Sequence, residues 1–178
     1  MQVPTSDGGA AIAAPPKRGR ALAGKYLTFK LGSEEYGLEI LKVREIIGLM
    51  TITPVPRAPG YVRGVINLRG KIIPVVDARR KFAMPEKGDT EETCIIVVDV
   101  SARGGSVDMG ILVDTVSEVL DIASADIEDT PAIGNDAAVE FILGMAKTGD
   151  SVKILLDIDR VLSTDAPTAV AETASEAP

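Results

Sequence analysis

Short runs of apolar, β-branched residues separated by glycine-containing turns fill the middle of this chain. Runs of this length, bounded by turn residues, are typical of β-strands. The clearest pair is a hairpin of residues 62–68 and 71–77, because Gly70 permits the positive φ that its Arg69-Gly70 tip requires. Further strands are predicted over residues 26–31, 35–40, 94–100, 107–113, 116–122, 141–147 and 152–157. So many short strands with few helices favour an all-β fold, either a sandwich or β-barrels.

A few segments depart from this strand pattern. Residues 41–47 carry apolar side chains at helical spacing and stop at Gly48, so a helix of about two turns is predicted there. The proline-rich stretch 53–60 contains Pro56-x-x-Pro59, a minimal polyproline ligand pattern, but a rigid loop leading into the next strand explains it better. Single helical turns are expected at residues 124–128, 136–141 and 158–162.

The two ends of the chain differ in composition from the body between them. Residues 1–24 hold six Ala, four Gly and three Pro, and residues 164–178 hold five Ala, three Thr and two Pro. Neither end has a periodic apolar face, so burial cannot offset the entropy cost of ordering it. We therefore expect disordered tails at residues 1–24 and 164–178 around a folded body of residues 25–163.

The chain contains no histidine and a single cysteine, Cys94. The missing histidine removes the commonest general base, every Ser-His-Asp or Cys-His arrangement and any His-ligated zinc. A lone cysteine cannot form an internal disulfide, and the β-branched neighbours of Cys94 predict a buried core residue rather than a nucleophile. No metal or other cofactor is therefore expected.

Charge and hydropathy exclude two further classes of protein. With 19 Lys and Arg against 26 Asp and Glu and only 3% aromatic residues, the chain lacks the cationic surface and stacking platforms of a nucleic-acid-binding protein. No apolar run approaches the roughly 18–20 residues that cross a bilayer, and the basic residues near the N-terminus follow the apolar patch instead of preceding it, unlike a signal peptide. A cytoplasmic protein without direct membrane insertion is expected.

Four apolar runs end in aspartate, at Asp77, Asp99, Asp114 and Asp157. In a doubly wound α/β fold, such strand-end aspartates would converge to bind Mg²⁺ or to accept a phosphoryl group. The seven residues between Asp99 and the strand that begins at residue 107 are too few for the helical crossover of parallel strands, so this link is predicted to be a hairpin. A small Asp-dependent Mg²⁺ or phosphoryl enzyme is thus disfavoured, and the aspartates more simply end strands.

Arg69 stands out because it projects from a stiff turn between two apolar strands. Most arginines at hairpin tips are simply solvated. A rigid guanidinium beside a strand that contains Gly64 can also present a surface to a partner, since arginine is enriched among residues that dominate binding energy. Glycine inside a strand pattern further marks a bulge or the close approach of another backbone. The residues themselves leave both interpretations of Arg69 open.

Several segments, taken in their order, carry a family resemblance. They are residues 29–32, 35–38, 40–46, 54–59, 62–77 and 110–120, and the most specific run is 64–70, Gly-Val-Ile-Asn-Leu-Arg-Gly. Over nearly all of residues 25–163 the chain resembles CheW, the family of coupling proteins of bacterial chemotaxis. The resemblance implies two SH3-like five-stranded β-barrel subdomains with a shared apolar interface and short helices.

The function that this resemblance implies is that of a non-catalytic adaptor. Such a protein bridges the cytoplasmic tips of methyl-accepting chemoreceptors to the regulatory domain of the histidine kinase CheA, which is itself CheW-like. The expected location is cytoplasmic, at membrane-associated chemoreceptor arrays. A coupling module of another sensory or motility array is the alternative within the same class.

The resemblance also marks two groups of partner-binding positions. The first group, which matches positions tied to receptor binding, is Val43, Glu45, Gly64 and Arg69, with Asn67, Leu68 and Gly70 from the most specific run. The second group, which could be partner contacts or packing residues, is Gly110, Val116, Val119 and Gly144. An ion pair between Glu45 and Arg69 is implied. Ala78 and Thr115 depart from the residues usual in the family, which leaves the interface details of the second barrel open.

Overall fold

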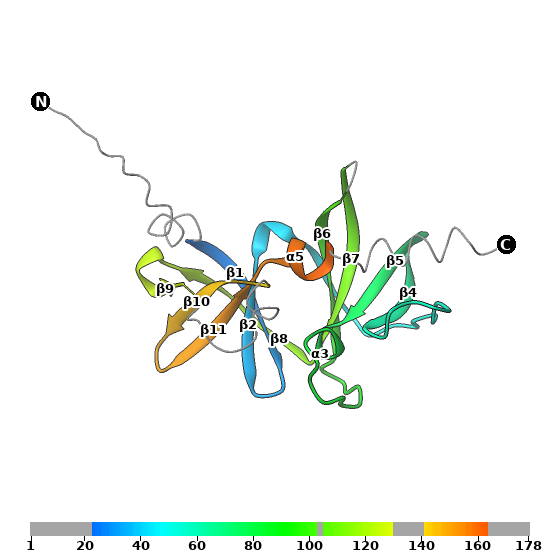
Figure 1. Ribbon diagram of the computed structural model, residues 1–178, viewed down its shortest axis with the longest axis horizontal. Helices are drawn as coiled ribbons and strands as arrows, with labels where there is room; N and C mark the ends of the chain where they lie inside the picture. Colours follow the sequence, from blue (N-terminus) through cyan, green and yellow to red (C-terminus); the bar gives the residue numbers. More distant parts are fainter. Residues whose placement is uncertain (1–22, 103–104, 130–140, 164–178) are drawn as a thin grey trace, which may run out of the picture.

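The computed structural model describes residues 23–102, 105–129 and 141–163. Residues 1–22 of the tail predicted at 1–24, the whole tail predicted at 164–178 and most of the helical turn predicted at 136–141 lie outside the described residues. Gly24, predicted to belong to the tail, is the first residue of a strand. Within them, eleven strands form two sheets that lie side by side along the long axis of the molecule (Figure 1). The predicted all-β class is confirmed.

Each sheet has a defined strand order. Sheet 1 has the order β8 (Thr115–Ile122), β1 (Gly24–Leu31), β2 (Glu34–Glu39), β11 (Ser151–Leu156), β10 (Ile142–Thr148) and β9 (Ile127–Glu128). Sheet 2 has the order β3 (Val43–Gly48), β6 (Cys94–Ala102), β7 (Gly105–Val113), β5 (Lys71–Asp77) and β4 (Val62–Leu68). The short helices among the described residues are η2 (Ile40–Lys42), α3 (Ala78–Lys81), η3 (Ser124–Asp126) and α5 (Ile158–Ser163). Sheet 1 thus gains a short sixth strand, β9, beyond the five strands expected in each barrel.

Both halves of the chain contribute to each sheet. The hairpin β1–β2 pairs with β8 and β11 of the C-terminal half, and the hairpin β6–β7 pairs with β3 and β5 of the N-terminal half. Each exchanged hairpin has an antiparallel neighbour on one side, β8 or β3, and a parallel neighbour on the other, β11 or β5. The two sheets are therefore pseudo-symmetric, and sheet 1 is not contiguous in sequence.

The hairpins β4–β5 and β10–β11 repeat each other in their strand register. Gly64 and Gly144 each lie just after a register shift in the first strand of their hairpin. Asp77 and Asp157 each follow or end the second strand and accept a hydrogen bond from the backbone N–H three residues later, at the start of α3 or α5. The body is therefore an internal duplication with exchanged hairpins, a repeat that our sequence patterns did not reveal.

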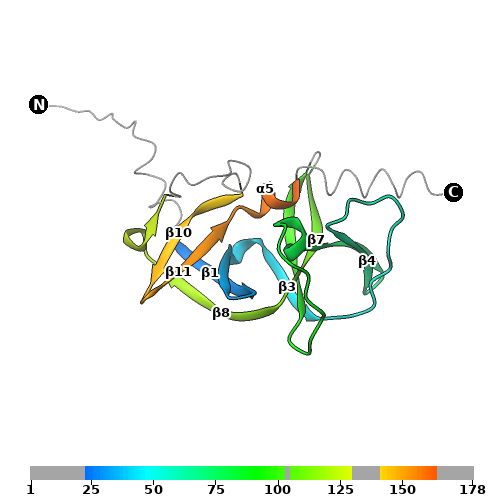
Figure 2. The same cartoon turned by 60° about the horizontal axis from the view of Figure 1, so that its bottom comes forward.

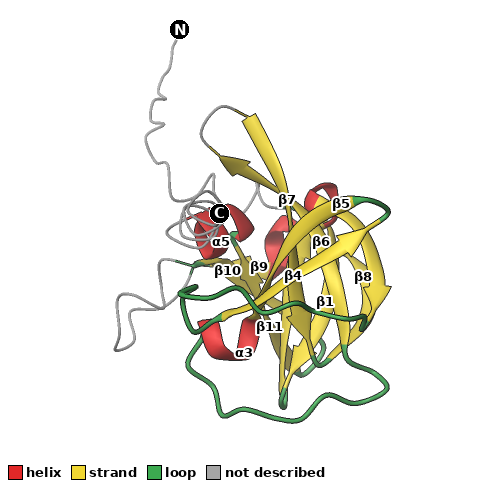
Figure 3. Ribbon diagram, turned by 90° about the vertical axis from the view of Figure 1, so that its right-hand side faces the viewer, coloured by secondary structure: helices red, strands yellow, loops and turns green. Residues whose placement is uncertain are grey.

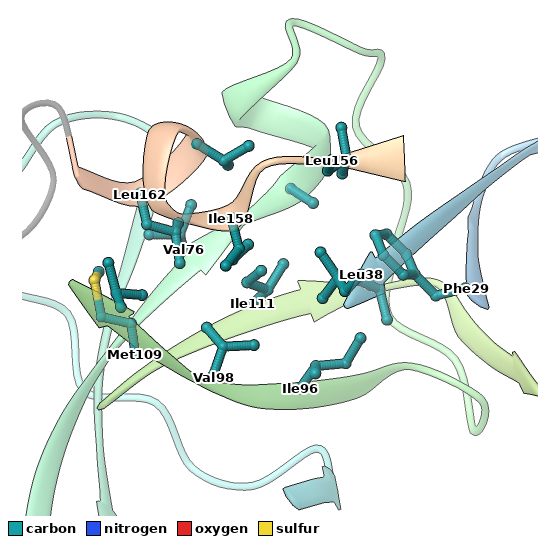
Figure 4. Packing of buried hydrophobic residues seen from close by; sticks show 14 of the residues in the cluster. Phe29, Leu38, Val76, Ile96, Val98, Met109, Ile111, Leu156, Ile158 and Leu162 are labelled. Atoms are coloured by element: carbon teal, nitrogen blue, oxygen red, sulfur yellow. The ribbon is translucent and has the colours of Figure 1, made fainter. Parts of the chain in front are cut away.

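Three apolar cores hold this arrangement together. One lies within sheet 2, one within sheet 1, and the largest lies between the sheets. Figure 4 shows Phe29 and Leu38 of sheet 1 approaching Ile96 and Ile111 of sheet 2, with Ile158 of α5 above them. The strong curvature of the sheets around these cores is clearest in Figures 2 and 3. The shared apolar interface that the family resemblance implies is present.

The helix predicted over residues 41–47 is wrong. Only Ile40–Lys42 form a 3-10 turn, and Val43–Gly48 form β3, which pairs with β6. A short apolar segment fits the helical and the strand period almost equally well, so pairing with the edge of β6 and the preference of β-branched residues for strands decide the outcome. Leu41, expected on the apolar face of that helix, is instead 94% exposed.

The other local predictions are confirmed only in part. The helical turn at 158–162 is confirmed as α5, whereas 124–128 divides into η3 and the strand β9, and α3 was not predicted. Cys94 packs against the inter-sheet core as predicted, but it is half-buried rather than buried. Burial still raises the pKa of its thiol, which keeps Cys94 protonated and a poor nucleophile.

Asp114 joins the two sheets where β7 leads into β8. Its carboxylate accepts hydrogen bonds from Arg79 of α3, Nε at 2.8 Å and Nη2 at 2.6 Å, and from the backbone N–H of Gly32 in the β1–β2 turn at 2.8 Å. The Arg79 and Asp114 side chains are only 12% and 18% exposed. The hydrogen bond from Arg79 holds the pKa of the Asp114 carboxyl below its usual value. One carboxylate therefore ties α3 to the opposite sheet.

Replacing Asp114 by asparagine is expected to lower the free energy of unfolding at pH 7 by about 2 kcal/mol, because hydrogen bonds to a charged group are lost. Since the folded-state pKa is depressed, the contribution of Asp114 is present above the unfolded-state pKa and is lost as the pH falls below about 4. In urea unfolding, the free energy of unfolding should fall less between pH 7 and pH 2.5 for Asp114→Asn than for the wild type. Equal pH dependence in both proteins would contradict this role.

Candidate partner-binding surfaces

The ion pair between Glu45 and Arg69 connects opposite edges of sheet 2. Glu45 lies on β3, the first strand in the order, and Arg69 lies at the tip of the hairpin whose first strand, β4, is the last. The Nη2 of Arg69 donates to Oε1 of Glu45, as the family resemblance implies. A main-chain bridge between Thr53 and Val65 joins the loop after β3 to β4 as well. The two contacts together close sheet 2 into a barrel.

The hairpin tip holds Arg69 in a fixed position at the surface. Arg69 and Gly70 have φ angles of 52° and 87°, and the side chain of Asn67 accepts a hydrogen bond of 2.8 Å from the Gly70 backbone N–H. The Arg69 side chain is 69% exposed although it is paired with Glu45. Leu68, just before the tip, packs against the core of sheet 2. Asn67, Leu68 and Gly70 thus support the presentation of Arg69.

Gly64 and Gly110 are packing positions in this structure. A Cβ atom on Gly64 would lie 2.1 Å from the backbone oxygen of Thr53, and the φ of Gly64 is 144°. A Cβ atom on Gly110 would lie 2.8 Å from Cγ2 of Ile95. Both glycines are buried. The expected bulge and close backbone approach at Gly64 are confirmed, and both residues shape sheet 2 from within.

The remaining predicted residues lie at the margin of the inter-sheet core or on the other sheet. Val43, at the start of β3, and Val116, in β8, are half-buried at the margin of the core between the sheets. Val119 is 49% exposed on β8, and Gly144 is buried in β10. The structure therefore brings Glu45, Asn67, Leu68, Arg69 and Gly70 together and places Val116, Val119 and Gly144 on the other sheet.

Strand registers show that some residues of the two groups occupy equivalent positions in the two repeats. Gly64 pairs with Val75 as Gly144 pairs with Leu155, and these two partners in turn pair with Gly110 and Gly37, so Gly110 and Gly37 correspond. Gly37 pairs with Thr28 as Gly110 pairs with Val97, so the next residues, Phe29 and Val98, also correspond. Phe29 then pairs with Val116 as Val98 pairs with Val43. In the same way, Leu27 pairs with Val119 as Ile96 pairs with Ile46. Val43 and Val116 are therefore counterparts in the two repeats, and so are Ile46 and Val119.

Sequence patterns did not identify the exposed apolar residues beside these positions. Ile72 is 61% exposed next to the Arg69 tip, and Val152, its counterpart in the second repeat, is 50% exposed. Both stand in the outer part of a strand whose other apolar residues are more deeply buried. A strict alternation of polar and apolar residues along 71–77 and 151–156 could have suggested these exposed positions. The sequences of β5 and β11, however, do not alternate regularly. Each repeat therefore carries an exposed apolar side chain beside its hairpin tip.

A polar cleft of about 690 Å³ borders the beginning of β8. Thr115, Val116 and Ser117 line one side of the cleft, and residues of the loop before β6, among them Lys87 and Glu91, line the other. The start of β8 is therefore open to the surface.

The four strand-end aspartates hold structural positions. Asp77 and Asp157 cap α3 and α5, and Asp114 binds Arg79 and Gly32. Asp99 accepts a hydrogen bond from Arg44, as does the residue opposite it, Asp108. No group of three or more potential metal ligands occurs among the described residues. The predicted hairpin after Asp99 is confirmed, because β6 and β7 are antiparallel.

Two exchanged β-barrels with rigid hairpin tips and exposed apolar side chains define a protein-binding scaffold. The CheW-like domain family matches residues 25–166. The chain therefore belongs to the CheW-like family, the coupling adaptors of chemotaxis. Within the described residues, no helix is long and apolar enough to cross a membrane.

Relatives support this assignment over most of the chain. The chain is 38% identical to the chemotaxis protein CheW of Klebsiella aerogenes over 147 residues, which are 83% of this chain and 86% of that protein. It is 37% identical to CheW of Rhizobium meliloti over 139 residues, 78% of this chain and 87% of that one. The crystal structure of the scaffolding protein TtCheW from Thermoanaerobacter tengcongensis superimposes with a TM-score of 0.71 at 35% identity, covering 82% of this chain and 96% of that one.

Proposed function

We propose that this protein is a non-catalytic adaptor that couples methyl-accepting chemoreceptors to the histidine kinase CheA. It works in the cytoplasm at membrane-associated chemoreceptor arrays and binds the receptor tip and the regulatory domain of the kinase. Membership of the CheW-like family over residues 25–166 supports this proposal. The observation that carries it is Arg69, an arginine fixed at the rim of a closed barrel and still 69% exposed.

The surroundings of Arg69 suit a helical receptor tip. The guanidinium is held by Glu45 and by the rigid turn, so little side-chain entropy is lost when a partner binds. Ile72, 61% exposed beside it, adds an apolar contact. A fixed cation next to an apolar side chain is typical of the residues that dominate interface energy.

An adaptor role also agrees with how the chain uses its acidic residues. The aspartates that could have served an enzyme cap helices or pair with arginine in the described structure. These contacts give the aspartates structural roles, and coupling two partners by binding requires no catalytic step.

Replacing Arg69 by alanine is expected to weaken receptor binding by about 1–3 kcal/mol while the fold persists. The exposed pair with Glu45 contributes only about 0–1 kcal/mol to folding. Arg69→Lys should restore binding only in part, because an ammonium group cannot reproduce the planar donor fork of arginine. Co-sedimentation with receptor-bearing membranes, in the presence of CheA, measures binding, and a thermal melt of each variant measures stability.

Arg160→Ala is the matched control for this experiment. Arg160 is also an exposed arginine in an ion pair, with Asp157 at 3.6 Å, but it lies on α5. It should co-sediment like the wild type. If Arg69→Ala also co-sediments like the wild type, Arg69 is not a binding residue; if Arg69→Ala unfolds, its pair with Glu45 is structural.

A further inference from the structure

When equivalent positions of the two barrels are compared, the second barrel lacks one side chain that the first barrel has. Val119 and Ile46 are counterparts, and each directly follows a glutamate, so Glu118 is the counterpart of Glu45. The pairs Leu68–Lys71 and Thr148–Ser151 close the tips of the two equivalent hairpins. Gly149 therefore stands where the first repeat has Arg69. The second repeat keeps the carboxylate of the ion pair and lacks the arginine.

Glu118 is held rigidly with its side chain in solvent. Its backbone carbonyl accepts a hydrogen bond of 2.8 Å from the Thr28 hydroxyl, and its backbone N–H donates to the same oxygen at 3.2 Å. Thr28 is fully buried, so the backbone of β8 is fixed at this point. The side chain of Glu118 is exposed.

Two other exposed carboxylates of sheet 1 have cationic partners. Asp121, the second acidic residue of β8, pairs with Lys25 at 3.3 Å, and Glu128 of β9 pairs with Lys147 at 2.7 Å. Within the described residues, the Glu118 carboxylate takes part in no ion pair or hydrogen bond. Next to it in the chain, Val119 exposes 49% of its surface. An unpaired carboxylate thus stands on a strand whose backbone is fixed.

We propose that Glu118 docks a basic side chain of the chemoreceptor tip, which supplies in trans the cation that Arg69 supplies in cis in the first repeat. The inference rests on the proposed function, since it adds a contact for the same partner. The face around Glu118 shares its strand geometry with the face around Glu45, including Val116 and Val119 in place of Val43 and Ile46. The carboxylate of Glu118 is therefore carried at the same place in its sheet as the carboxylate of Glu45.

The charges of the two faces distinguish what each accepts. Arg69 neutralises the charge of Glu45, whereas the exposed Glu118 keeps its negative charge. Opposite charges across an interface add specificity and speed association. The preferred ligand of Glu118 is therefore a lysine or arginine on a receptor helix.

The test measures binding of the full chain to a soluble cytoplasmic tip fragment of a methyl-accepting chemoreceptor, by calorimetry. Glu118→Gln is expected to weaken binding about tenfold, and Glu118→Lys more strongly, because a charge pair becomes a repulsion. Added salt should reduce wild-type affinity more steeply than that of Glu118→Gln. Asp121→Asn is the matched control: this exposed carboxylate on the same strand is already paired, so its affinity should stay within about twofold of the wild type.

A second variant supplies the missing cation within the chain. Gly149→Arg combined with Asp150→Gly copies the Arg69-Gly70 tip, whose turn accepts an arginine at positive φ. The new arginine should pair with Glu118 and weaken receptor binding severalfold by competition. When Glu118→Gln is also present, the same two tip substitutions should not weaken receptor binding any further.

The outcomes separate this inference from the proposed function. If the wild type binds the receptor tip and Glu118→Gln binds equally well, the docking role of Glu118 is wrong and the adaptor function stands. A loss of binding by Glu118→Gln toward the CheA regulatory domain alone would also overturn it. If the wild type does not bind the receptor tip at all, both proposals fail. Circular-dichroism melts show that each variant is folded.

Discussion

Gly64→Ala is expected to lower the free energy of unfolding by about 4 kcal/mol or more, enough to unfold a domain of ordinary stability. The added methyl group would lie 2.1 Å from the Thr53 oxygen and 2.7 Å from its carbonyl carbon, both backbone atoms. The φ of 144° adds backbone strain that alanine cannot avoid. Relief would require breaking the bridge between Thr53 and Val65 that helps to close sheet 2.

Gly60→Ala is the control for this substitution. Gly60 lies in the loop that leads into β4, has no positive φ, and a Cβ atom there would meet nothing within 4 Å. The free energy of unfolding of Gly60→Ala, measured in urea, should equal that of the wild type within about 0.5 kcal/mol. If Gly64→Ala has wild-type stability yet fails to bind receptors, Gly64 is a contact residue and its packing role here is wrong.

Glu35→Ala is expected to destabilise the protein by about 3 kcal/mol, because it leaves the charge of Lys153 without a partner. Lys153 lies on β11 with only 8% of its side chain exposed, and its ammonium group donates to Glu35 on the neighbouring strand β2. No other partner of this ammonium group occurs among the described residues. Removing one member of a buried pair is costly since the other keeps its desolvation penalty. Thermal and urea unfolding measure the loss.

The first repeat supplies the control for this pair. Ile73, the counterpart of Lys153 in the equivalent hairpin, is buried in the core of sheet 2. Lys153→Ile should therefore fit the fold and cost less than about 1 kcal/mol, because Glu35, with 24% of its side chain exposed, can turn toward water. Adding Lys153→Ile to Glu35→Ala should recover most of the lost stability. An unrecovered double variant would show that the loss comes from packing rather than from the unpaired charge.

These stability effects bear on how binding experiments are interpreted. Gly64, Gly110 and Gly144 are buried, so substitutions at them can abolish coupling by disturbing a barrel. Arg69 and Glu118 are exposed and can be changed with little cost to folding. Binding variants are therefore best placed at the exposed residues, with the glycine variants as measures of fold integrity.

Local patterns were reliable wherever one short-range signal sufficed. The hairpin of residues 62–77 was predicted with its ends and its Arg69-Gly70 tip, because the apolar β-branched runs, the turn chemistry and the glycine all agreed. The antiparallel link after Asp99 followed from its length alone. The helix at 41–47 failed because a short apolar segment satisfies two periods, and its pairing with β6, far along the chain, decided between them.

The sequence by itself determined the all-β class, most strand positions, the exclusion of histidine chemistry and the family resemblance that led to Glu45 and Arg69. Only the tertiary structure decided that β1–β2 and β6–β7 exchange between sheets, that Lys153 has its charge buried, and that Glu118 occupies the place of Glu45 without an arginine. The physical reason is the range of the interactions. Strand period and turn chemistry act over a few residues, whereas parallel pairing and inter-sheet packing join residues far apart in the chain, and their free energy exists only once the whole core has formed.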